Sequence, residues 1–192
     1  MPKNKKITKY IDMILMIDSS GSMEGERLEH AKAAAIDFVQ GLDFNRYKIS
    51  VLEFHCNYKY HCRFSNDRDK VISAINEIKI LGSFENFCEV IGKNYRNFPR
   101  DSVNTKIMVI LTDGRWKYQF YEWISASIAK SKGIYIFAIG FGEADEKFLR
   151  RISSKGFGQK VDLTQLKKAF SEVTNKINSE DPYNNLEYFL WK

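Results

Sequence analysis

Short runs of apolar residues alternate along the chain with longer segments in which apolar residues recur every three or four positions. Apolar runs without polar alternation are typical of strands buried on both faces of a parallel sheet. Two of the strand-like runs are separated only by a short polar turn, which predicts a hairpin that ends in an antiparallel edge strand. The predicted strands are residues 11–17, 47–54, 58–64, 107–111, 133–139 and 159–163.

The segments between these runs have the spacing of amphipathic helices. The second of them starts near Ser65-Asn-Asp-Arg and buries Val71, Ile72, Ile75 and Ile78. Strands that alternate with helices predict an α/β fold, doubly wound, with a mostly parallel central sheet of about six strands, one antiparallel edge strand, and helices on both faces. The other predicted helices are residues 26–42, 85–95, 118–131 and 166–177.

Composition adds a domain organisation to this pattern. A chain of 192 residues, with 44% apolar and 28% charged residues, is typical of one globular domain, which we place at residues 1–178. Residues 179–192 form a tail of different composition, because Pro182 breaks the last helix. The tail either packs on the domain or docks a partner in a groove. Its large apolar residues are Leu186, Tyr188, Phe189, Leu190 and Trp191.

The distribution of charged and apolar residues argues against nucleic acid and membranes as partners. The formal net charge is +6, but the basic residues are scattered and no aromatic-interleaved basic block is present, so nucleic acid is not the expected partner. No apolar run approaches the roughly 20 residues of a membrane span. Residues 1–10 lead directly into the first strand without a signal-peptide pattern, so we expect a cytoplasmic protein with no membrane contact.

The cysteines offer little chemistry. The chain has only three cysteines, an odd number, which favours free reduced thiols over a set of disulfides. The pairs His55-Cys56 and His61-Cys62 contain four residues of the types that bind zinc. Adjacent residues on a strand point to opposite faces, however, so each pair splits its ligands and a zinc site is disfavoured.

A polar cluster follows the first apolar run. Asp18, Ser20 and Ser22 lie between a predicted strand and a predicted helix, at the edge of an α/β sheet where ligands bind. The permissive backbone of Gly21 allows a tight turn there. One carboxylate and two hydroxyls form an all-oxygen set that suits a hard cation such as Mg²⁺. An alternative role for Ser22 as a helix N-cap would explain that residue alone.

Several segments together resemble one family. Asp18-Ser-Ser-Gly-Ser-Met23 is similar to the Asp-x-Ser-x-Ser signature of the metal-ion-dependent adhesion site (MIDAS) of von Willebrand factor A (vWA) domains. Thr112-Asp113-Gly114, after an apolar run, resembles the distal aspartate loop of that site, and Leu81-Gly82-Ser83 stands where the family usually has Gly-Gly-Thr. Ala138-Ile-Gly-Phe-Gly142 is similar to a segment near the end of many vWA domains. The resemblance covers about residues 8 to 178.

The resemblance implies a metal site and a protein partner. It implies Mg²⁺, with Mn²⁺ or Ca²⁺ as alternatives, held by Ser20, Ser22 and Ser83 and, directly or through water, by Asp18 and Asp113. One coordination position is then left for an Asp or Glu carboxylate of the partner. The residues expected at the rim, where they would select that partner, are Phe84, Glu85, Arg115 and Trp116.

The resemblance also suggests a setting. A cytosolic single-domain vWA protein is similar to bacterial proteins of the tellurite-resistance and stress-response type, so we expect an interaction module of a stress-response or signalling complex. The alternatives are a partner of a MoxR-type AAA+ ATPase, an adhesion module of a larger or secreted protein, and a hydrolase. An enzyme is disfavoured because His30, His55 and His61 lie away from the predicted loops, which leaves no general base.

Overall fold

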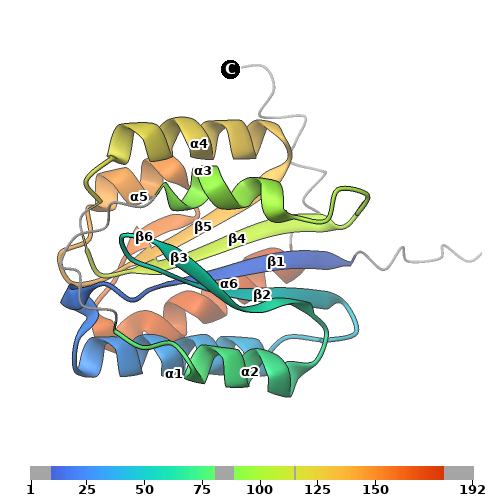
Figure 1. The fold of residues 1–192 in the computed structure, drawn as a ribbon, viewed down its shortest axis with the longest axis horizontal. Helices are drawn as coiled ribbons and strands as arrows, with labels where there is room; N and C mark the ends of the chain where they lie inside the picture. The colour runs from blue at the N-terminus through green and yellow to red at the C-terminus, as the bar shows by residue number, and fades with distance from the viewer. Residues whose placement is uncertain (1–9, 81–88, 115, 180–192) are drawn as a thin grey trace, which may run out of the picture.

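A six-stranded sheet forms the centre of the computed structural model, which describes residues 10–80, 89–114 and 116–179 (Figure 1). The strands are β1 (Ile11–Asp18), β2 (Tyr47–Phe54), β3 (Tyr58–Ser65), β4 (Thr105–Thr112), β5 (Ile134–Gly140) and β6 (Gly158–Lys160). Their order is β3-β2-β1-β4-β5-β6, and only β3 runs antiparallel to its neighbour. The predicted fold class is confirmed.

Helices cover both faces of the sheet, as Figure 1 shows. On one face lie α1 (Glu26–Gln40), α2 (Arg68–Asn76) and α6 (Leu166–Ser179). On the other lie α3 (Val90–Asn94), α4 (Gln119–Ser131) and α5 (Glu146–Ile152). Short 3₁₀ turns complete the described elements: η1 (Gly21–Met23), η2 (Tyr95–Asn97) and η3 (Leu163–Gln165). None of the helices in the described part of the chain has the length and apolar character needed to cross a membrane.

The central strand β1 contributes side chains to the hydrophobic cores on both faces of the sheet. Met13, Leu15 and Ile17 pack toward α1, α2 and α6, whereas Ile14 and Met16 pack toward α3, α4 and α5. All five side chains are buried. This two-sided burial explains why the first strand is apolar throughout rather than alternating.

The topology places a crevice beside β1. This strand lies between β2 and β4, and the chain leaves β1 for α1 on one face and β4 for α4 on the other. Neighbouring strands whose connections diverge to opposite faces leave a crevice at their carboxyl ends, which is where ligands bind in such sheets. Asp18 ends β1 and Thr112 ends β4, so these residues border that crevice.

The hairpin of β2 and β3 departs from regular pairing. The register shifts twice, and one shift inserts His61 between the residues paired with Val51 and Leu52. His61 and Cys62 therefore face the same side, so the alternation argument applied to this pair was wrong. The His61 ring contacts Glu53 (Nε2 to Oε2, 2.7 Å) and Glu77 (Nδ1 to Oε2, 3.3 Å) rather than a thiol.

Two predicted elements are shorter than expected. The last strand ends at Lys160, because its neighbour β5 ends at Gly140: the Val161 amide still donates to the Gly140 carbonyl (2.8 Å), and the chain then turns into η3. Within the described residues the helix predicted at 85–95 is confined to α3 and continues as η2. The predictions that lie outside the described residues concern Ser83, Phe84, Glu85, Cys88, Arg115 and the tail residues 186–191.

Candidate metal centre

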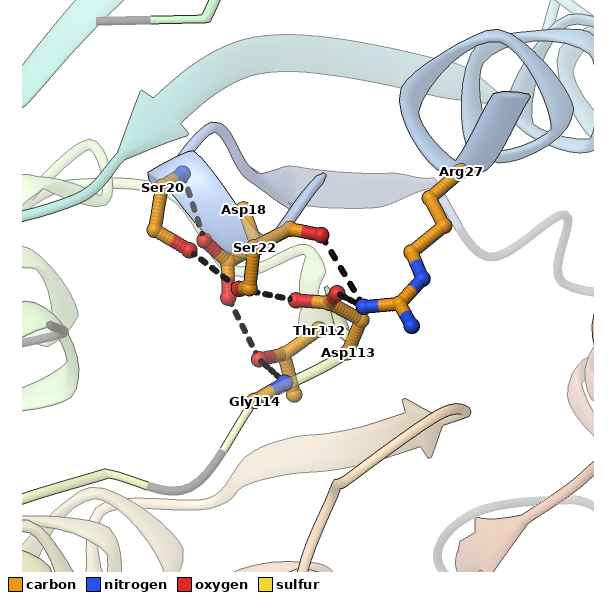
Figure 2. A network of polar contacts seen from close by, with 7 residues as sticks. All are labelled: Asp18, Ser20, Ser22, Arg27, Thr112, Asp113 and Gly114. Carbon is orange, nitrogen blue, oxygen red and sulfur yellow. Dashed lines mark hydrogen bonds and ion pairs between the residues drawn. The ribbon is translucent and has the colours of Figure 1, made fainter. Parts of the chain in front are cut away.

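Asp18 joins the ends of two neighbouring strands. Its side chain is completely buried. Oδ1 accepts a hydrogen bond from the Ser20 amide (2.9 Å), and Oδ2 accepts one from Thr112 Oγ1 (2.5 Å), as Figure 2 shows. Since Thr112 is the last residue of β4, the carboxylate is fixed between the first loop and the strand that leads to the second loop.

Burial makes ionisation of Asp18 costly. Loss of solvation raises the pKa of this carboxyl from 3.8 to about 6, although the hydrogen bonds from Ser20 and Thr112 lower it, and the nearby charge of Asp113 adds to the rise. A bound cation offsets such a cost, because it favours the charged form of the carboxylate. The position is therefore poorly suited to a lone structural aspartate and well suited to a cation ligand.

The two serines connect Asp18 to Asp113. The hydroxyl oxygens of Ser20 and Ser22 are 3.1 Å apart, and Ser22 Oγ donates to Asp113 Oδ1 (2.7 Å). Asp113 follows β4 directly and is completely buried. Four of the five predicted site residues, from loops far apart in the sequence, thus meet at one place, while Ser83 belongs to the residues not described (Figure 2).

Thr112 is a residue of the site that sequence reasoning overlooked. Its hydroxyl donates to Asp18 and lies 3.1 Å from Trp116 Nε1 and 3.4 Å from the Gly114 amide, both of which donate to it. The signal was available, because Thr112 stands in the same Thr-Asp-Gly motif as Asp113. Only the aspartate had been given a role.

Arg27 was also overlooked. This residue of α1 donates from Nη1 to Asp113 Oδ2 (2.9 Å) and to the Ser22 carbonyl (3.0 Å), and its side chain is 43% exposed (Figure 2). It belongs to no part of the motif. One signal did exist: a basic residue in the first turn of a helix opposes the helix dipole, which favours pairing with a carboxylate.

The loop after β5 packs against the backbone of Asp113. The Glu143 amide donates to the Asp113 carbonyl (2.9 Å). Gly142 has a φ of +56°, and a Cβ at this position would lie 3.3 Å from that carbonyl oxygen. The glycine that ends the Ala-Ile-Gly-Phe-Gly segment is thus required both by its backbone conformation and by close approach to the site.

Two expectations about the site, the exposure of Trp116 and the role of Gly21, were wrong, and the alternative role of Ser22 is excluded. Trp116 is not at the rim: it is 4% exposed, and its ring lies 5.4 Å from the rings of Phe54 and Phe148. Ser22 does not cap α1, whose N-cap is Gly25. The left-handed backbone position in this loop is Gly25 (φ +80°), not Gly21.

The donor set fits a hard divalent cation. The atoms that converge are carboxylate oxygens of Asp18 and Asp113 and hydroxyl oxygens of Ser20 and Ser22, which suit Mg²⁺, Mn²⁺ or Ca²⁺. Across the described ranges no three His, Cys, Asp or Glu side chains group to hold a metal, so a cation here depends on hydroxyl ligands. Such a cation would take the place of the hydrogen bond that now joins the hydroxyls of Ser20 and Ser22.

Comparison with characterised proteins finds matrilins among the relatives. Matrilin-1 of Gallus gallus is 26% identical over 186 residues, which covers 88% of this chain and 36% of the relative. Matrilin-3 of the same species is 26% identical over 183 residues, covering 87% of this chain and 39% of the relative. The chain therefore spans well under half the length of these relatives.

Solved structures share the fold. The vWF domain of the type V pili tip protein Mfa5 from Porphyromonas gingivalis has a TM-score of 0.75 at 13% identity, covering 90% of this chain and 96% of that one. BatB from Bacteroides thetaiotaomicron has a TM-score of 0.72 at 19% identity (88% and 99% covered). Proximal thread matrix protein 1 from the mussel byssus, solved with a zinc-occupied MIDAS motif, has a TM-score of 0.72 at 19% identity (88% and 46% covered).

The family follows from the sequence as a whole. The profile of the von Willebrand factor type A domain matches residues 12–180, a range that contains almost the whole sheet and all the described helices. The sheet order and the crevice between β1 and β4 agree with that match. The chain belongs to the von Willebrand factor type A domain family.

Proposed function

We propose that this domain is a metal-dependent protein-binding module that captures an Asp or Glu carboxylate of a partner protein through Mg²⁺, with Mn²⁺ or Ca²⁺ as alternatives. The observation that carries the proposal is the meeting of two completely buried carboxylates, Asp18 and Asp113, with the hydroxyls of Ser20 and Ser22. Ser83 is proposed as a further hydroxyl ligand.

The residues of the site have separable tasks. Asp18 is held by the Ser20 amide and the Thr112 hydroxyl, so its carboxylate is fixed before any ligand arrives. The serines offer neutral oxygens, so the negative charge around a bound cation would come from the two carboxylates alone. The cation, when bound, supplies a Lewis-acid position for the incoming carboxylate. No group in this arrangement is assigned a catalytic step.

An adhesion module of a larger or secreted protein is the second candidate. The relatives favour it, because matrilins match this chain over only about a third of their length and because a pilus tip protein shares the fold. The zinc-occupied MIDAS motif named for the mussel protein supports metal binding in this fold without fixing the metal here. The cytoplasmic location and the stress-response setting stay predictions, which cell fractionation and co-purification would test.

Titration calorimetry with Mg²⁺ and Mn²⁺ tests the metal claim. Wild-type protein is expected to bind one cation, and Asp18→Asn is expected to bind at least about tenfold more weakly, because a charged ligand is lost. Asp12→Asn is a matched control: Asp12 is also buried on β1, but at the opposite end, where it bonds to Ser102 and Asn104. Equal affinity of wild type and Asp18→Asn would contradict the proposal.

A further inference from the structure

Arg27 bonds to the carboxylate oxygen of Asp113 that Ser22 does not contact. Ser22 Oγ bonds to Oδ1 of this carboxylate, and Arg27 Nη1 bonds to Oδ2 (2.9 Å). The same nitrogen donates to the Ser22 carbonyl (3.0 Å), so the guanidinium joins the loops after β1 and β4. The Arg27 side chain remains 43% exposed, so part of it faces the solvent from which a ligand arrives.

The ion pair changes the charge of the site. Asp18 and Asp113 are close enough for their charges to act on each other, and both are completely buried. Arg27 supplies a permanent positive charge that cancels one of the two negative charges. Coulomb interactions across a few ångströms near a protein surface are large enough to alter the affinity for a divalent ion.

We propose that Arg27 sets the two affinities of this site: its charge weakens the binding of the cation and strengthens the binding of the ligand carboxylate. The inference rests on the proposed function. A fixed positive charge beside Asp113 repels the incoming cation. Once the cation is bound, the same charge leaves the site with a net charge of about +1 instead of zero, and that excess attracts an anionic side chain.

A purely structural role for Arg27 makes a different prediction. If the guanidinium only holds Asp113 in place, its removal weakens cation binding and ligand binding together. If it acts through its charge, its removal strengthens cation binding and weakens ligand binding. The two affinities therefore separate the roles, and a lysine at this position should preserve both affinities if they depend on the charge and not on the shape of the guanidinium.

The test uses Mn²⁺ as the cation and acetate as the carboxylate. We compare wild type, Arg27→Gln and Arg27→Lys, with Arg150→Gln as a control that removes a guanidinium from an exposed pair with Glu146 on α5. Calorimetry is expected to show Mn²⁺ binding to Arg27→Gln about three- to tenfold more tightly than to wild type, and acetate binding to the Mn²⁺-loaded variant weaker by a similar factor. Arg27→Lys and Arg150→Gln should match wild type.

The outcomes separate this inference from the proposed function. Mn²⁺ binding to Arg27→Gln that equals or falls below that of wild type, or unchanged acetate binding, overturns the role of Arg27 alone. A wild-type protein that binds no Mn²⁺ overturns the proposed function together with this inference. If Arg27→Gln does not fold, as judged by thermal melting, Arg27→Met takes its place because it keeps the apolar stem of the side chain.

Discussion

Asp18 is retained at a cost to the stability of the domain. Its pKa in the folded protein, about 6, lies above the value of 3.8 expected for an exposed aspartate. The folded state therefore binds the proton more tightly than the unfolded state does. The resulting stabilisation is fully present below about pH 4 and is lost as the pH rises through about 6. Buried charge of this kind is typical of functional sites.

Replacing Asp18 by Asn should stabilise the protein in EDTA. At about pH 8 we expect Asp18→Asn to be more stable than wild type by about 1 kcal/mol, because it removes a buried charge while its amide oxygen still accepts from the Ser20 amide. The hydrogen bond that the Thr112 hydroxyl donates is lost and offsets part of the gain. At about pH 5 the difference should shrink. Urea denaturation at both pH values measures it, and a variant less stable than wild type at the higher pH would contradict this account.

The two missed residues show where motif reasoning ends. Asp18, Ser20, Ser22 and Asp113 were predicted because each stands in a short motif directly after an apolar strand. Arg27 makes its ion pair with a residue 86 positions away, and the choice of partner depends on how α1 lies beside the loop after β4. Sequence spacing alone does not carry that information.

At the scale of elements, α4 anchors the start of α3. Glu122 of α4 is 1% exposed, and its Oε1 and Oε2 accept from the Ile91 amide (3.3 and 3.1 Å). The N-cap residue of α3, Glu89, makes no capping bond with its own side chain. Burial raises the pKa of Glu122 to about 8, although backbone hydrogen bonds from residues 90–92 lower it.

Glu122 should therefore contribute to the pH dependence of folding. Its raised pKa stabilises the protein fully below about pH 4.5, and this stabilisation is lost as the pH rises through about 8. We expect the free energy of unfolding of wild type to fall by roughly 2 kcal/mol between about pH 6.5 and pH 9, and that of Glu122→Gln to fall much less.

Chemical denaturation of the two proteins at both pH values measures this difference. Glu146→Gln on α5 serves as the control, because that glutamate is 45% exposed. The control should keep the wild-type dependence. A Glu122→Gln variant that keeps the wild-type pH dependence would show that the buried carboxyl does not titrate in this range.

Elements were easier to predict than their contacts. Five of the six strands were predicted closely. Four of them, β1, β2, β4 and β5, are apolar runs buried on both faces, which leaves a clear pattern in the sequence, and β3 was predicted from the hairpin turn before it. The register shifts of β3 left no such pattern, so the orientation of His61 was predicted wrongly. Trp116 was predicted at the rim, whereas its ring turns inward to Phe54 and Phe148.

At the scale of the whole molecule, the fold creates the site by bringing two loops to one crevice. The loop after β1 supplies Asp18, Ser20 and Ser22, and the loop after β4 supplies Asp113. Neither loop alone has a sufficient set of oxygen atoms. The fold and this junction were predictable because strand order and motif position agree. The partner was not, because its identity depends on surface chemistry that no motif specifies.

The central claim is that a divalent cation binds at this junction. Anomalous diffraction from crystals grown with Mn²⁺ tests it most directly. We predict a single strong peak between the ends of β1 and β4, about 2.2 Å from the hydroxyl oxygens of Ser20 and Ser22, which is lost in Asp18→Asn. A well-ordered junction without a peak, or a peak that persists unchanged in Asp18→Asn, would contradict the account.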